Sequence, residues 1–159
     1  MNSGLSEELL NSFSDITPTV IPTRIDPLWL AGFTSADGCF SVQVAKSKTK
    51  IGYAVGLRFI LTQHSRDTEL MRSLLSFFNC GILQVDSKKA AVYFVVTKLA
   101  DIQDKIVPFF VKYSLQGSKM LYFADWCKVV DICKVKAHLT PEGLELIRQI
   151  QLGMNRGRH

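Results

Sequence analysis

Two pairs of alternating segments constrain this chain more than any other feature. Residues 40–47 and 53–63 alternate apolar and polar side chains, as strands with one buried face do. Residues 81–87 and 90–97 form a second such pair, joined by a Ser-Lys-Lys tip. Apolar residues at helical spacing precede this second pair over 67–78. We therefore predict an α+β fold in which helices cover one face of a four-stranded antiparallel sheet.

Helices account for most of the remaining apolar sequence. Asp26 and Pro27 match an N-cap followed by a proline at the first helical position, which predicts a helix that ends near Gly38. Further helices are predicted over 99–113, 119–138 and 141–154. Pro108 is expected to cut the first of these helices near its end, because proline removes a backbone donor.

The chain divides into one domain and two short flanks. Residues 1–25 are polar and punctuated by proline, which is typical of an arm or linker. The domain is predicted over 26–155, and 156–159 form a tail. Trp29 and Trp126 are expected to anchor the core of the domain.

The composition favours a polyanionic partner. The 159 residues carry a net charge of +5, and the pI is about 9.1. A solvated basic surface is the other interpretation of this charge. The sequence shows no apolar run of the ~18 residues that a membrane span needs, and we recognise no secretory signal. Four cysteines without metal-ligand spacing, Cys39, Cys80, Cys127 and Cys133, are expected to be reduced and mostly buried thiols rather than zinc ligands.

The segment LAGFTSADG, residues 30–38, combines small residues at helical spacing with a carboxylate at its end. Gly32 and Ala36 are four residues apart, so they lie on one helical face and permit close packing of a second helix. Asp37 ends the helix. If a second copy packs here, two Asp37 carboxylates converge and can hold divalent cations for phosphodiester hydrolysis. A packed helix that ends in an Asp-Gly turn is the alternative.

This segment resembles the LAGLIDADG motif of homing endonucleases. The predicted helix-strand-strand order is similar to the αββαββα unit of that family, with its saddle-shaped sheet and additional C-terminal helices. The likeness extends over residues 26–155, through LTQHSRDTELM and FVVTKLADIQDKIVPFF, and is greatest to the C-terminal half of two-motif fungal mitochondrial members. Ser35 replaces the first acid of the motif, whereas Asp37 keeps the position of the metal-binding carboxylate.

The resemblance implies a function. It implies a site-specific double-strand DNA endonuclease that uses Mg²⁺, with Mn²⁺ or Ca²⁺ able to occupy the same site, and that leaves short 3′ overhangs. It also implies a mitochondrial location. One unit supplies one carboxylate, so we expect a homodimer on a long, near-palindromic site. A non-cutting nucleic-acid binder, such as an intron maturase, and an inactive half that needs its partner half are the alternatives.

Two further residues join Asp37 as catalytic candidates through the resemblance. Gln63 matches a position that orients water near the scissile phosphate, and an ordinary polar strand end is its other interpretation. Lys119 matches a region that supplies a basic residue to stabilise transition-state charge. A solvated lysine near a helix N-terminus is the other interpretation of Lys119.

The polar face of the sheet is the predicted DNA-binding surface. Its small and amide side chains leave room for base edges in the major groove, and the lysines at the strand tips suit phosphates. The predicted DNA-binding residues are Ser41, Gln43, Ala45, Lys46, Ser47, Lys48, Lys50, Arg58, Gln84, Lys88, Lys89 and Tyr93. The predicted dimer interface consists of Leu30, Gly32, Phe33 and Ala36.

Overall fold

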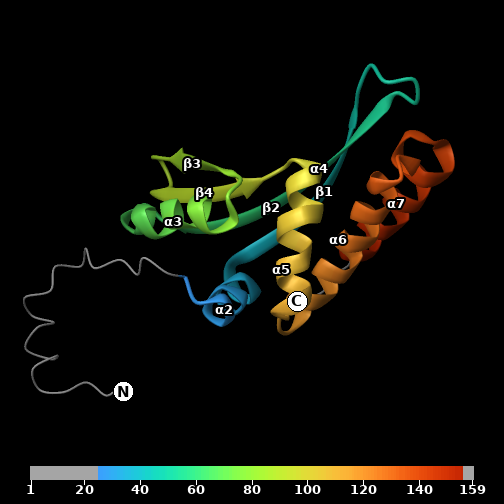
Figure 1. Ribbon diagram of the computed structural model, residues 1–159. Helices are drawn as coiled ribbons and strands as arrows, with labels where there is room; N and C mark the ends of the chain where they lie inside the picture. Colours follow the sequence, from blue (N-terminus) through green and yellow to red (C-terminus); the bar gives the residue numbers. More distant parts are fainter. Residues whose placement is uncertain (1–24, 156–159) are drawn as a thin grey trace, which may run out of the picture.

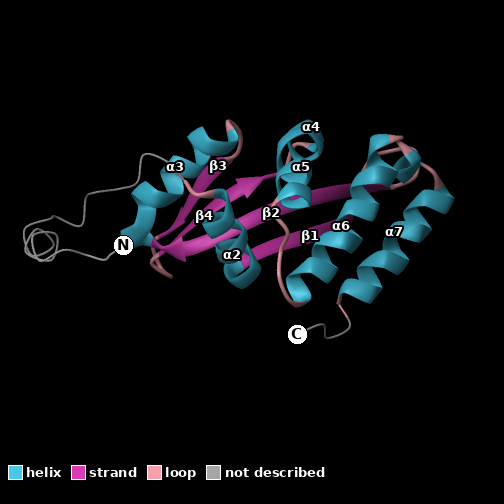
Figure 2. Ribbon diagram, turned by 60° about the horizontal axis from the view of Figure 1, so that its bottom comes forward, coloured by secondary structure: helices cyan, strands magenta, loops and turns pink. Residues whose placement is uncertain are grey.

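A computed structural model describes residues 25–155 of the chain. One antiparallel sheet has the strand order β1-β2-β4-β3, and helices lie against one of its faces (Figures 1 and 2). The strands are β1 (Gly38–Lys46), β2 (Tyr53–His64), β3 (Ile82–Asp86) and β4 (Ala91–Val96). The predicted α+β class and the two hairpins are confirmed. The arm over 1–24 and the tail over 156–159 lie outside the described residues.

Helix α2 (Pro27–Asp37) runs into strand β1 without a loop. Asp26 is the predicted N-cap, and its Oδ1 accepts a hydrogen bond from the Leu28 N–H at 3.0 Å. Gly38 stands where the helix meets the strand. A Cβ added at Gly38 would lie 2.7 Å from the carbonyl oxygen of Thr34, so only glycine permits this sharp junction.

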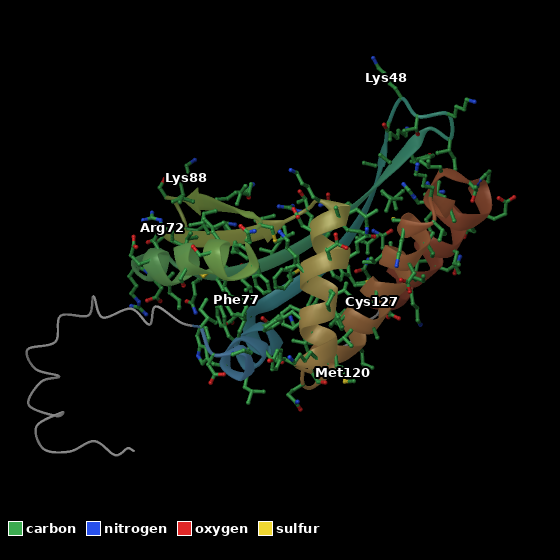
Figure 3. All side chains as sticks on the ribbon, viewed as in Figure 1. Lys48, Arg72, Phe77, Lys88, Met120 and Cys127 are labelled. Carbon is green, nitrogen blue, oxygen red and sulfur yellow. The ribbon has the colours of Figure 1, made fainter. Side chains whose placement is uncertain are left out.

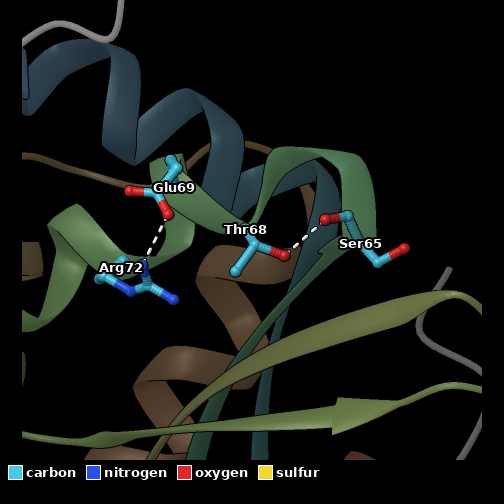
Figure 4. A network of polar contacts seen from close by, with 4 residues as sticks. All are labelled: Ser65, Thr68, Glu69 and Arg72. Carbon is cyan, nitrogen blue, oxygen red and sulfur yellow. Dashed lines mark hydrogen bonds and ion pairs between the residues drawn. The ribbon is translucent and has the colours of Figure 1, made fainter. Parts of the chain in front are cut away.

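Helix α3 (Thr68–Phe78) precedes the second hairpin and follows a 3₁₀ turn over Ser65–Asp67. The Thr68 hydroxyl donates to the Ser65 carbonyl oxygen at the start of the helix (Figure 4). An ion pair of 2.6 Å joins Arg72 and Glu69 on the solvent side, as Figure 4 also shows. This arrangement is typical of an amphipathic surface helix.

The next helical segment is continuous across Pro108. It consists of α4 (Leu99–Asp101), a π-helical turn (Ile102–Ile106) and α5 (Val107–Lys112). The prediction that Pro108 cuts this helix is wrong. The wider π turn lies directly before the proline, where the backbone donor is missing, and it lets the helix continue.

Helices α6 (Ser118–Lys134) and α7 (Pro141–Met154) complete the helical layer. Trp126 of α6 is fully buried, as predicted, and its ring packs 5.0 Å from that of Phe40. Trp29, by contrast, is 43% exposed, so its assignment to the core is wrong. It stacks on Phe33 along the outside of α2.

The four cysteines differ in their exposure to solvent. Only Cys133 is buried, and Cys39 is exposed on β1, which corrects the expectation of mostly buried thiols. All four are free thiols. Between residues 25 and 155, no helix combines the length and the apolar character required to cross a bilayer.

Candidate nucleic-acid interface and cleavage site

Asp37 is exposed at the C-terminal end of α2, where the sheet begins. Lys119, in the first turn of α6, reaches the same point, because its Nζ donates to the carbonyl oxygen of Gly38. The structure therefore brings the Lys119 side chain to the residue that follows Asp37, although 81 residues separate Lys119 from Gly38 in the sequence.

A second connection holds the loop before α6 against α2. The Gln116 N–H donates to the Ser35 hydroxyl at 2.9 Å, and that hydroxyl donates to the Ala31 carbonyl oxygen at 2.8 Å. Ser35, which departs from the family motif, therefore has a structural role. It positions the loop that leads into α6, whose first turn carries Lys119.

Gln63 lies at the same end of the sheet. Gly38 is opposite Leu61 in the register, so Gln63 lies two residues further, toward the end of α2. Its partner across the sheet is Val92, which belongs to the core, so Gln63 is on the helix-covered side of the strand. Its Oε1 accepts a hydrogen bond from the His64 N–H at 3.1 Å, which commits the amide to its own strand.

The carboxylate of Asp37 is a hard oxygen donor of the kind that Mg²⁺ prefers. The described residues contain no group of three or more His, Cys, Asp or Glu side chains that could hold a metal ion. At this end of the sheet, Asp37 is the carboxylate that one unit could offer to a metal ion. Further ligands would have to come from a second unit, from a nucleic acid or from water.

A groove of about 670 Å³ borders the Asp37 end of the sheet. It is bounded by β1, the first turn of α6 and the last turn of α7. Its polar lining includes Cys39, Ser41, Ser118, Lys119, Gln151 and Asn155. The open groove brings a cationic side chain and hydroxyl donors to the edge of β1, which are groups that suit a phosphodiester backbone.

The register confirms that the polar side chains share one face of the sheet. Ser41 is opposite Arg58, and Gln84 is opposite Tyr93. The alternate positions, such as Phe40, belong to the core. The predicted residues on this open face are Ser41, Gln43, Ala45, Arg58, Gln84 and Tyr93. Gln43 and Gln84 are exposed, and Arg58 is half-buried.

The remaining predicted DNA contacts lie at the two hairpin tips. Lys46 ends β1, and Ser47, Lys48 and Lys50 follow in the turn to β2. Lys88 and Lys89 occupy the turn between β3 and β4, where their backbone N–H groups donate to Asp86 Oδ1. Figure 3 shows Lys48 and Lys88 far apart, both on the side of the sheet away from the helices. Cations therefore stand at both ends of the open face.

Helix α2 also carries an apolar face that none of the residues 25–155 covers. Leu28 is 69% exposed, and Gly32 and Ala36 are exposed as well. A Cβ added at Gly32 would meet no atom within 4 Å, so nothing within the described chain requires a glycine there. Leu30, in contrast, is 0% exposed and packs in the core. Its assignment to the interface is wrong, because the side chain presents no surface to a partner.

Comparison with known proteins decides the family. The family model described as LAGLIDADG endonuclease matches residues 30–130, which is more than half of the chain. This chain belongs to the LAGLIDADG endonuclease family. The probable intron-encoded endonuclease 3 of Neurospora crassa is 36% identical to it over 162 residues, which cover 98% of this chain and 30% of that protein.

Solved LAGLIDADG homing endonucleases have the same fold. I-SmaMI bound to cleaved DNA is 47% identical with a TM-score of 0.81, and the match covers 100% of this chain and 55% of that chain. I-LtrWI bound to target DNA is 39% identical with a TM-score of 0.85, at 100% and 55% coverage. The chain thus spans just over half the length of these structures and about a third of the curated relatives.

Some residues of this LAGLIDADG unit escaped the sequence analysis. Tyr122, Gln151 and Asn155 line the groove beside Lys119, and the last two lie beyond residue 130, where the family match ends. The sequence predicts that Gln151 lies in a helix and that Asn155 follows it. It does not predict that this helix packs beside β1, which is what brings both residues to the groove.

Proposed function

We propose that this chain is a DNA-cutting unit of a homing endonuclease, which recognises a long site and hydrolyses both strands with 3′ overhangs. The observation that carries this proposal is the position of Asp37. An exposed carboxylate ends the same helix whose apolar face is left uncovered by the described part of the chain. A partner helix on that face would bring a second carboxylate beside the first.

The open face of the sheet would bind the duplex. A two-stranded ribbon fits the major groove, where Gln and Arg side chains can hydrogen-bond to adenine and guanine edges. The tip lysines would contact phosphates and supply affinity that does not depend on sequence. Gln43, Arg58 and Gln84 are the side chains that we assign to base recognition.

The residues around Asp37 would act on the scissile phosphate. Lys119 would place its positive charge where the transition state gains negative charge. Gln63 would orient a water molecule once its amide leaves the His64 N–H. Asp37 would hold a divalent cation, Mg²⁺ or a substitute such as Mn²⁺ or Ca²⁺, which supplies charge neutralisation and a more acidic water when it is bound.

The chemistry of a cut in both strands implies two such units. We propose that α2 packs against α2 of a second copy about a two-fold axis, with Gly32 and Ala36 at the contact. Identical sheets would then read identical half-sites, so the target would be palindromic or nearly so. A mitochondrial location remains our prediction. It is supported by the intron-encoded fungal relative.

A second arrangement has an observation in its favour. The chain covers only 55% of the I-SmaMI chain, which leaves room for another unit of similar size. In that arrangement, α2 would meet a non-identical helix and the target would not be symmetric. A non-cutting maturase is less favoured, because Asp37 is retained and exposed.

The test combines cleavage with selection. Sites selected by the protein from a randomised duplex library would be cloned into a plasmid and incubated with the chain and Mg²⁺. We expect linear product that disappears when EDTA removes the metal. Binding without any cleavage over a range of Mg²⁺ and Mn²⁺ concentrations would instead identify a non-cutting binder.

A further inference from the structure

The outer half of the first hairpin has little support from the sheet itself. Strand β2 pairs with β4 only over Phe59–His64, whereas its pairing with β1 continues as far as Tyr53 opposite Lys46. Residues Val42–Lys46 and Tyr53–Leu57 therefore form a two-stranded segment, which we name the outer ribbon. Isolated two-stranded ribbons are marginally stable in water, so this segment needs contacts from elsewhere in the chain.

Helix α7 supplies such contacts at both ends of the outer ribbon. The guanidinium carbon of Arg148 lies 4.5 Å from the centre of the Tyr53 ring, within the range of a cation–π interaction. One turn further along α7, Gln151 Nε2 donates to the Val42 carbonyl oxygen at 2.8 Å. The outer edge of β1, which pairs with no other strand in the described sheet, is thus hydrogen-bonded by a side chain.

Tyr53 also connects α7 to the turn of the hairpin. The Thr49 hydroxyl donates to the Tyr53 carbonyl oxygen at 2.7 Å, and the Gly52 N–H donates to the Thr49 carbonyl oxygen at 2.9 Å. The turn that carries Lys48 and Lys50 is therefore anchored on the residue that Arg148 contacts. At its other end, α7 lines the groove beside Lys119 through Met154.

We propose that Arg148 and Gln151 are positioning residues that set the pose of the outer ribbon on DNA, and so determine how strictly the bases under it are discriminated. The inference rests on the proposed DNA-binding function. Neither residue is assigned a contact with DNA. A ribbon released from α7 keeps its contacting side chains but samples several poses, so the wrong bases become better tolerated.

The test is a complete single-base specificity profile. After a site has been selected with the wild-type chain, the relative affinity of every single-base variant is measured for wild type, Arg148→Ala and Tyr53→Leu. Tyr53→Phe and Gln149→Ala are controls: the first keeps the aromatic ring, and the second alters a neighbouring α7 residue that pairs with Glu145. Both controls should match wild type.

We expect Arg148→Ala and Tyr53→Leu to reduce discrimination about two- to fivefold at one contiguous run of base pairs in each half-site, with the other positions unchanged. A purely structural loss would lower the active fraction and scale all affinities equally, leaving the profile intact. An unchanged profile, or a uniform change at every position, overturns the inference alone. A wild-type chain that selects no site overturns the proposed function and the inference with it.

Discussion

The two helix-hairpin units of this fold are built alike but differ in what they leave exposed. Helices α2 and α3 both have 11 residues and both precede a hairpin. The buried residues of α3 are Met71, Leu74 and Phe78, and its exposed side carries charged and polar groups. Helix α2 buries Leu30 against the core, yet it also exposes Leu28, which is 69% accessible.

This difference is the reason why we assign the proposed partner contact to the first unit. Helix α3 buries its apolar residues against the sheet and exposes its polar side. Helix α2, in contrast, has a second apolar face that is exposed, and it ends in an exposed carboxylate. The hairpins differ in the same sense, since β1 and β2 have 9 and 12 residues and β3 and β4 have 5 and 6. The strands of the second hairpin are short, whereas β1 and β2 of the first hairpin continue beyond the part of the sheet in which β2 pairs with β4. Matched substitutions in the two units test this assignment.

The largest difference is expected between Asp37→Asn and Asp67→Asn. Asp37→Asn should lower the cleavage rate at least about a thousandfold, because it removes the charge that we propose as the metal ligand, while DNA affinity stays within about threefold. Asp67 precedes α3 and makes no side-chain cap hydrogen bond, so its variant should cut like wild type. Plasmid cleavage and gel-shift titrations measure both quantities. Full nicking by Asp37→Asn would disprove the catalytic assignment.

Gly32→Leu and Ser76→Leu each place a leucine on an exposed helix surface. The monomer should accept Gly32→Leu, because a Cβ there meets no atom within 4 Å. A partner helix should not accept it, since overpacking a close contact costs roughly 3 kcal/mol, or about a hundredfold in the dimer dissociation constant. We expect loss of the dimer and of cleavage with an unchanged or higher Tm. Sedimentation measures the dimer dissociation constant of both variants. Equal dissociation constants for Gly32→Leu and Ser76→Leu would contradict a special role for α2.

Several elements were predictable from the sequence because period-2 alternation determines which residues share a face. The position of Ser41 and Arg58 on the same side follows from that parity, whereas their direct pairing depends on the register, which alternation does not determine. Trp29 and Leu30 were misassigned because α2 is apolar on two sides, and spacing cannot tell which side the chain's own core covers. The contact of Arg148 with Tyr53 depends on how helix α7 crosses the sheet, for which the sequence holds no local signal.

Arg58→Ala and Lys88→Ala compare the sheet surfaces of the two units. Arg58→Ala should reduce discrimination at one or two base pairs by ~1–3 kcal/mol, the scale of a bidentate base contact. Lys88→Ala should weaken binding to all sequences alike and lower the salt dependence, because a phosphate contact carries no sequence information. Binding ratios over single-base variants, measured at two salt concentrations, separate the effects. If Arg58→Ala binds all single-base variants in the same ratios as wild type, another face of the protein recognises the bases.

The smallest expected difference lies between Cys39 and Cys80. Cys39 is exposed on β1 at the end of the sheet that carries Asp37, whereas burial and, to a lesser degree, Asp101 raise the pKa of Cys80. At pH 8, iodoacetamide should therefore modify Cys39 several-fold faster, since the thiolate is the reactive form. Bound DNA should slow the reaction of Cys39 and leave Cys80 unaffected. Peptide mass spectrometry over time follows both sites, and faster reaction of Cys80 would contradict the predicted order.

The two remaining cysteines, the half-buried Cys127 and the buried Cys133, provide an internal reference for this experiment. Burial and the carboxylate of Asp131 raise the pKa of Cys127 to about 12, and burial raises that of Cys133 to about 11. Both thiols should therefore stay protonated and unmodified at pH 8 until the chain unfolds.

The mass of the chain in solution tests the central claim most directly, because the account requires a second unit on the face of α2 that residues 25–155 leave exposed. Light scattering at the concentration used for cleavage should give twice 17.8 kDa, and Gly32→Leu should give 17.8 kDa and no cleavage. A wild-type species of 17.8 kDa that still cuts both strands would contradict the account, because a single Asp37 would then suffice.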